Sequence, residues 1–243
     1  MTAEAATETE ALRARLADLR RRIGEAAGRA GRRPEEVTLV AVSKTHPAAL
    51  VRAAHAAGAR DFGENRVKEA EEKIAELAGV GPRPRWHLIG HLQSNKARRA
   101  VKLFDLIHTV DTAELVGRLE RLCEEESRDH LEVLVQLDLA GESSKSGARA
   151  EELPAVAEAL GACRRVRCAG LMTLPPFFEE AGRVRPYFQR LRELRDEWRG
   201  RGLFADGPGE LSMGMSHDFE AAIEEGATVV RVGTALFGER GGR

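Results

Sequence analysis

The side chain with the clearest potential for covalent chemistry is that of Lys44. It ends a short, apolar and β-branched segment, residues 37–44 (VTLVAVSK), which is typical of a buried strand. A lysine at the partly dry end of such a strand loses its proton more easily, and its neutral amine can form an imine with a carbonyl compound. A lysine whose amine simply extends to water is the alternative. Only six of the 38 Lys and Arg residues are lysines, which gives weight to a Schiff-base role and leaves both interpretations open.

A second group of candidate residues ends the last two predicted strands. Residues 211–216 (LSMGMS) and 231–238 (RVGTALFG) are rich in glycine and in hydroxyl side chains. Gly233 lets the backbone approach an anion closely, Thr234 offers a hydroxyl, and free N–H groups at such a turn point outward. (β/α)8 barrels frequently bind phosphate between these two loops. Ordinary turn chemistry, with Ser216 capping a helix, is the alternative.

Other polar residues have simpler explanations. His87 and His91 face the same side of a strand in the segment WHLIGHLQ, and we expect both to be polar groups with partners in the barrel. Asn65 follows a strand and can be a helix cap. Lys145 lies in the polar segment 141–147 (GESSKSG), which we interpret as a surface loop where the lysine can also contact an anion.

The elements that must position these residues alternate regularly between strand and helix patterns. The predicted strands are residues 37–44, 59–64, 85–90, 105–110, 131–139, 166–174, 209–213 and 228–232. Alternating βα units imply a parallel sheet with right-handed crossovers. Eight units in 243 residues predict a single (β/α)8 TIM-type barrel. A doubly wound open sheet is the alternative, weakened because no G-x-G-x-x-G follows the first strand.

An extra helix is predicted before the barrel. In residues 1–36, Leu12, Leu16, Leu19 and Ile23 fall at helical spacing. We therefore divide the chain into an N-terminal helix (1–36) packed on the barrel and the barrel itself (37–243). In such a barrel the carboxyl ends of the strands carry the functional groups.

Composition excludes several classes of function. The net charge of −1 without a run of Lys and Arg argues against nucleic acid as a partner. No apolar stretch is long enough to span a membrane, and the acidic N-terminus does not look like a signal peptide. The three cysteines lack the spacing of a disulfide framework or a zinc site. We therefore expect a cytoplasmic protein without a metal ion.

Seven separated motifs resemble a known family. They are VAVSKTHP (40–47), FGENRVKEA (62–70), WHLIGHLQSNKAR (86–98), GESSKSG (141–147), GLMTLPP (170–176), LSMGMSHDFEAAIEEG (211–226) and VRVGTALFG (230–238). In this order they are similar to the pyridoxal phosphate homeostasis proteins, which bind pyridoxal 5′-phosphate (PLP) on a barrel like the N-terminal domain of alanine racemase. The resemblance covers the chain from about Val37 to Gly238.

The resemblance implies a role for each candidate residue. Lys44 would hold PLP as a covalent aldimine, Ser212, Gly233 and Thr234 would hold the phosphate, Arg231 would face the pyridine nitrogen, and Asn65 and Met213 would line the cofactor. The implied function is to carry and buffer PLP, in support of vitamin B6 and amino-acid homeostasis, without robust turnover. Apo forms of PLP-dependent enzymes would be acceptors, and we expect a monomer.

Two other functions stay open on the sequence alone. One is a PLP-dependent enzyme acting on amino acids, such as a weak racemase. A racemase of this class has a second, β-rich domain with a catalytic tyrosine, whereas we expect this chain to end after its eighth strand, with Tyr187 as its only tyrosine, in an outer helix. The other is a Schiff-base lyase that uses Lys44 without PLP.

Overall fold

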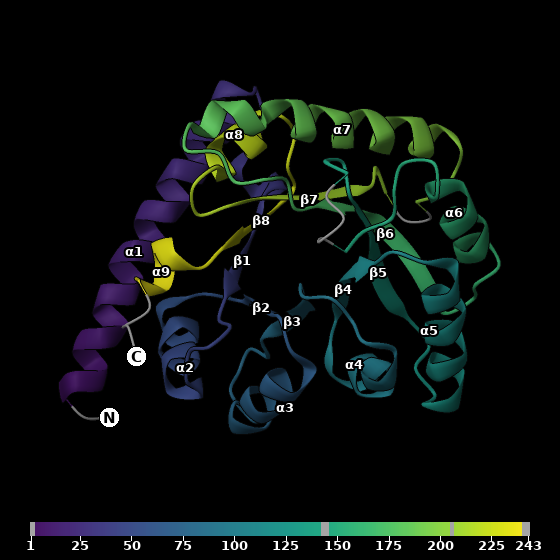
Figure 1. The fold of residues 1–243 in the computed structure, drawn as a ribbon. Coiled ribbons are helices and arrows are strands. Elements are labelled where there is room, and N and C mark those ends of the chain that lie inside the picture. Colours follow the sequence, from purple (N-terminus) through teal and green to yellow (C-terminus); the bar gives the residue numbers. More distant parts are fainter. Residues whose placement is uncertain (1–2, 142–145, 205–206, 240–243) are drawn as a thin grey trace.

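The computed structural model describes residues 3–141, 146–204 and 207–239. In these residues eight parallel strands close a barrel in the order β1-β2-β3-β4-β5-β6-β7-β8, with β1 paired to β8, and helices surround it (Figure 1). This confirms the predicted (β/α)8 barrel. The open-sheet alternative is wrong, because an open sheet has no pairing between its first and last strands in this order.

The strands lie close to their predicted positions. They are β1 (Thr38–Val42), β2 (Asp61–Glu64), β3 (Arg85–Leu88), β4 (Leu106–Val110), β5 (Leu131–Leu137), β6 (Val166–Thr173), β7 (Glu210–Met215) and β8 (Val229–Val232). The helices are α1 (Ala3–Arg29), α2 (Ala48–Ala57), α3 (Val67–Glu76), α4 (Ala97–Leu103), α5 (Ala113–Glu125), α6 (Leu153–Gly161), α7 (Arg185–Gly200), α8 (Phe219–Glu224) and α9 (Thr234–Phe237). Short 3-10 turns precede β1, α4 and α7.

The apolar core lies mainly between the strands and the helices. Its bulkiest fully buried side chains include Phe62, Trp86, Phe104 and Phe188. A second, separate cluster is small and consists of Leu106, Leu134 and Met172, with Ala169 and Leu174 packed against it. Buried polar groups are also present, among them His87, His108, Ser212 and Arg231.

The N-terminal helix α1 contacts α2, α8 and α9 (Figure 1). Leu12, Leu16, Leu19 and Ile23 are all buried, as their helical spacing indicates. Burial of each such side chain contributes about 1.5–3 kcal/mol. In the part of the chain that the structure describes, no helix is both long and apolar enough to cross a membrane.

Candidate functional site

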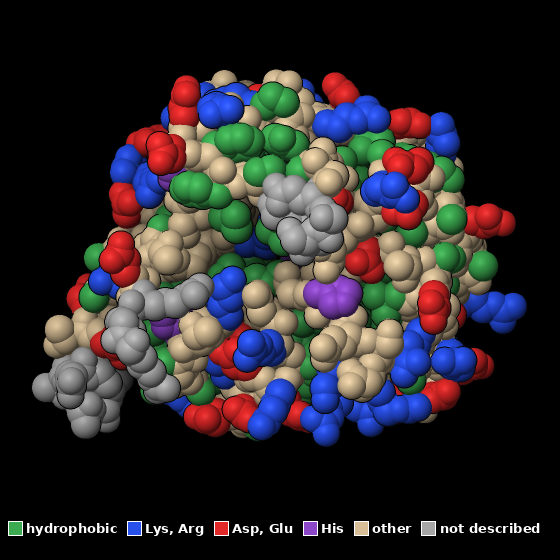
Figure 2. Space-filling view, in the orientation of Figure 1, with side chains coloured by type: hydrophobic (Ala, Val, Ile, Leu, Met, Phe, Trp, Pro, Cys, Tyr) green, Lys and Arg blue, Asp and Glu red, His purple; other side chains and the backbone are tan. Residues whose placement is uncertain are grey.

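The ends of β1, β2 and β8 meet at one point of the barrel rim. β1 pairs with β2 through Val42 and Gly63, and with β8 through Ala41 and Val232. Lys44 and Asn65 each lie two residues beyond the first of these pairs, and both are half-buried. Barrel closure therefore puts Lys44 between the segment at Asn65 and the turn that follows β8. Figure 2 shows a hollow near the centre of the barrel with basic side chains beside it.

The backbone on both sides of Lys44 is held by α3. Lys73 Nζ donates to the carbonyl oxygen of Ser43 (2.6 Å) and to carboxylate oxygens of Glu64 (2.6 Å) and Glu69 (2.7 Å). The same Glu69 oxygen accepts the N–H of Thr45, which has a φ of 69°, a conformation rare for a β-branched residue. One buried ammonium group thus organises the loop that carries Lys44.

The carboxyl group of Glu64 is fully buried beside this ammonium. Burial raises its pKa, while the hydrogen bonds from Lys73 and from the Ser43 hydroxyl (2.6 Å) lower it. Among the described residues its second oxygen, Oε2, has no hydrogen-bond partner. Removal of only one partner of such a buried ion pair strongly destabilises a protein.

The turn after β8 is a set of hydrogen-bond donors next to the Lys44 loop. The backbone N–H groups of Gly233 and Ala235 both point at Ser216 Oγ, at 3.2 and 3.4 Å. Gly233 lies against the end of β1, because a Cβ added to it would meet Val42 at 3.5 Å. Thr234 follows and is exposed. The turn at Gly233 and Thr234 thus adjoins the end of β1, two residues before Lys44.

Arg231 extends from β8 and is almost completely buried. Its Nη1 donates to Ser212 Oγ (2.5 Å) and its Nη2 to the carbonyl oxygen of Thr173 (2.9 Å). Burial lowers the pKa of the guanidinium to about 10, partly offset by the Asp218 carboxylate. The group stays cationic at neutral pH.

The other predicted residues differ in what their side chains contact and in how deeply they are buried. The Ser212 hydroxyl is bonded to Arg231 and His108, whereas Ser216 faces the Gly233 turn. The Met213 side chain is fully buried in the layer between strands and helices. His91 is exposed, since β3 ends at Leu88 and does not reach it. Lys145 lies outside the described residues.

Sequence reasoning undervalued Ser216 and missed Lys73. Ser216 belongs to the segment 211–216 that the sequence indicates as a phosphate loop, but the residues that the family resemblance assigns to the phosphate include Ser212 and not Ser216. Lys73 had one available signal, its position four residues after Glu69 on a predicted helix. Nothing in the spacing shows that its ammonium reaches back to Ser43.

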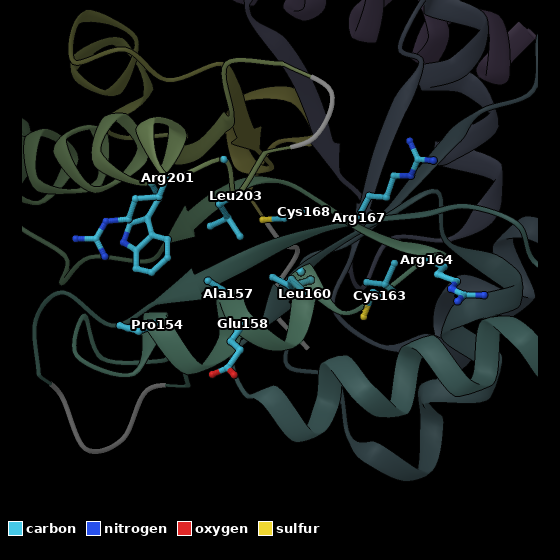
Figure 3. Close-up of a pocket in the computed structure, with 14 residues that line it drawn as sticks. Pro154, Ala157, Glu158, Leu160, Cys163, Arg164, Arg167, Cys168, Arg201 and Leu203 are labelled. Carbon is cyan, nitrogen blue, oxygen red and sulfur yellow. The ribbon is translucent and has the colours of Figure 1, made fainter.

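Two cavities are relevant to locating the site. One of about 440 Å³, lined by Asn65, Gly90 and Lys96, lies beside the ends of β2 and β3. Another of about 610 Å³ lies between α6, the end of α7 and the start of β6 (Figure 3). Since the strands are parallel, the start of β6 is at the opposite end of the barrel from Lys44, which follows the end of β1. In Figure 3 its thiols are those of Cys163 and Cys168, whose pKa values burial raises to about 11 and about 12. These thiols are protonated at neutral pH, so we assign no chemistry to this second cavity.

Within the ranges that the structure describes, no group of three or more His, Cys, Asp or Glu side chains could hold a metal ion. The described site offers instead an amine, backbone and hydroxyl donors, and a buried guanidinium.

The fold and these groups define a class of protein. A sequence model of the family described as alanine racemase, N-terminal domain, matches residues 11–241. The alanine racemase of Corynebacterium glutamicum has the same fold, with a TM-score of 0.67 at 19% identity, and the match covers 96% of this chain and 62% of that one. The chain is a barrel of the alanine racemase N-terminal class.

Within that class, curated relatives identify the family. The pyridoxal phosphate homeostasis protein of Pseudomonas aeruginosa is 48% identical over 225 residues, which cover 93% of this chain and 94% of the relative. The protein of the same name from Escherichia coli K12 is 43% identical over 226 residues, covering 93% and 95%. PipY of Synechococcus elongatus, solved with PLP bound, is 41% identical with a TM-score of 0.82, covering 93% and 100%. This chain belongs to the pyridoxal phosphate homeostasis protein family.

Proposed function

We propose that the protein binds PLP at the carboxyl ends of β1 and β8, and that it carries and buffers the cofactor in the cytoplasm, as a monomer, in support of vitamin B6 and amino-acid homeostasis. The observation that carries this proposal is the pairing of β1 with β8, which puts Lys44 beside the turn at Gly233 and Thr234. A lysine amine, phosphate-binding donors and a partner for the pyridine nitrogen are the groups that a PLP site needs. The residues present therefore fit the cofactor.

Each group has a defined task in this proposal. Lys44 forms a C=N bond with the aldehyde of PLP, and one water molecule is released. The donors of Gly233, Thr234 and Ser216 bind the phosphate, and Asn65 lines the site. Since the Ser212 hydroxyl contacts Arg231, we assign it to the pyridine end of the cofactor.

The charge of Arg231 supports a carrier more than an enzyme. A cation facing the pyridine nitrogen keeps that nitrogen unprotonated, which weakens the ring as an electron sink. Tyr187, the only tyrosine of the sequence, lies on α7 and stacks on Phe178 with ring centroids 6.0 Å apart. Its ring thus packs on the segment between β6 and α7. A PLP-dependent enzyme acting on amino acids therefore has no supporting observation of its own.

The protein loaded with PLP is expected to pass the cofactor to an apo-enzyme and to turn over amino acids very slowly. One positioned acid or base usually contributes 10²–10⁴-fold to a rate. The measurements are reactivation of an apo PLP-dependent enzyme with free PLP trapped, and chiral analysis of alanine and serine after long incubation. The cofactor-free protein is the control. A turnover number at or above about 1 s⁻¹, the lower end of typical enzymes, would contradict the carrier function.

Thr234→Val and Ser216→Ala are each expected to weaken PLP binding about 5- to 30-fold, the scale of a hydrogen bond to a charged group. Binding of pyridoxal, which lacks the phosphate, should change little in either variant. Ser212→Ala is the matched comparison. If the Ser212 hydroxyl acts on Arg231, its removal should weaken the binding of PLP and of pyridoxal equally. Titration of the apo-protein followed by absorbance measures all three. If Ser212→Ala weakens PLP selectively, the phosphate lies at Ser212 instead.

A further inference from the structure

Five side chains from five strands form a continuous hydrogen-bonded chain across the barrel. Arg231 Nη1 donates to Ser212 Oγ (2.5 Å), which lies 2.9 Å from His108 Nδ1. His108 Nε2 is 2.9 Å from His87 Nδ1, and His87 Nε2 is 3.0 Å from Asp61 Oδ1. The chain starts at the proposed cofactor site and ends at Asp61, the first residue of β2, whose side chain is 20% exposed.

The two ends of the chain fix every proton between them. A guanidinium can only donate hydrogen bonds, and a carboxylate can only accept them. The Ser212 hydroxyl accepts from Arg231, and its one other partner among the described residues is Nδ1 of His108, so its own buried proton can be donated only to that nitrogen. His108 then donates from Nε2 to Nδ1 of His87, and His87 donates from Nε2 to Asp61. Both histidines are thus neutral and carry their proton on Nε2.

The surroundings of the chain support this arrangement. His87, His108 and Ser212 are at most 1% exposed, and buried polar groups are tolerated when each is hydrogen-bonded. Burial, together with the nearby positive charge of Arg231, holds the pKa of His108 well below its usual range. His108 therefore stays neutral, as the direction of the hydrogen bonds requires.

We infer that His108 and His87 are positioning residues for Arg231. They orient the Ser212 hydroxyl as an acceptor and connect the buried cation to the carboxylate of Asp61, so that the guanidinium keeps one orientation. The link from Arg231 to the pyridine nitrogen rests on the proposed function. The direction of the hydrogen bonds does not depend on any ligand.

The first test uses ¹⁵N-labelled protein without PLP. Histidine ring ¹⁵N shifts at neutral pH should show His87 and His108 as neutral rings protonated on Nε2. Replacing each histidine singly by glutamine assigns the signals. A proton on Nδ1 of either ring, or a charged His108, would overturn the inference whether or not the protein binds PLP.

The second test measures how strongly the site prefers PLP over N-methyl-PLP, whose ring nitrogen has a fixed positive charge. The wild type should disfavour the methylated cation, because Arg231 is held against that nitrogen. In His108→Leu the preference should fall about tenfold, within the range for one hydrogen bond between neutral groups. His108→Gln, which keeps a donor and an acceptor, should retain most of it.

Asp61→Asn provides a variant at the partly exposed end of the chain, in case His108→Leu does not fold. It should lower the preference in the same direction, whereas Glu132→Gln, which belongs to a separate ion pair with Arg85, should not. An unchanged preference in a folded His108→Leu or Asp61→Asn protein would overturn the positioning role. Failure of the wild type to bind PLP would instead refute the proposed function. The histidine tautomers, measured without PLP, would still test the direction of the hydrogen bonds.

Discussion

Lys44→Ala is expected to abolish covalent attachment of PLP, with loss of its visible absorption band and of any adduct fixed by borohydride. Only the Lys44 amine is proposed to form the C=N bond with the aldehyde, so the loss should be complete rather than partial. The barrel should remain folded, because Lys44 lies beyond the last residue of β1 and its side chain is only half-buried. Visible spectra, peptide mapping after borohydride and thermal unfolding measure the three outcomes.

Lys96→Ala is the matched control for this experiment. Lys96 is also half-buried and lines the cavity beside Asn65. Its replacement should leave the band and the mapped adduct unchanged. A normal adduct in Lys44→Ala, or a modified peptide that contains Lys96 in the wild type, would show that the attachment site was assigned incorrectly.

Lys73→Met is expected to destabilise the protein by about 3–5 kcal/mol, the range for removing one member of a buried ion pair. Lys73 is 4% exposed, and its loss leaves the fully buried Glu64 and the Ser43 carbonyl without their shared donor. The loop around Lys44 should also loosen, so PLP should attach more slowly. Denaturant unfolding gives the free energy, and stopped-flow absorbance gives the rate.

A second lysine of the same helix shows whether this effect depends on burial. The Lys68 side chain is 81% exposed and lies 4.0 Å from Glu72, so Lys68→Met should change stability by no more than about 0.5 kcal/mol. Combining Lys73→Met with Glu64→Leu should recover part of the loss, because the unpaired buried carboxyl is then gone. Equal stabilities of the Lys73→Met and Lys68→Met proteins would contradict the structural role of the cluster.

Local pattern was sufficient to predict the elements of this barrel. Residues 37–44 and 228–232 are short, β-branched runs bounded by turn and helix signals, and such runs are strands for reasons that act within a few residues. The position of Lys44 after the first run, and of Gly233 and Thr234 after the last, follows from the same local signals. The pattern did not predict the end of β3, which stops at Leu88 rather than Gly90. This end is set by pairing with the neighbouring strands and not by a local sequence signal.

The motif 211–216 shows where local pattern stops being informative. Its two serines, Ser212 and Ser216, are chemically identical and four residues apart. The pairing of β7 with β8 shifts register between Ser212 and Met215, so one hydroxyl bonds to Arg231 and the other faces the Gly233 turn. A register shift is set by two strands together, and one strand's sequence does not contain it.

The sequence by itself determined the kinds of chemical group at this site and the strand that presents each one, because composition and periodicity are local properties of the chain. Only the tertiary structure decided which of them meet. Barrel closure makes β1 and β8 neighbours, which brings Val42, at the end of the strand before Lys44, to Gly233, and the packing of α3 brings Lys73 to the Ser43 carbonyl. These contacts join residues about 190 and 30 positions apart, and they depend on strand order and helix packing across the whole domain.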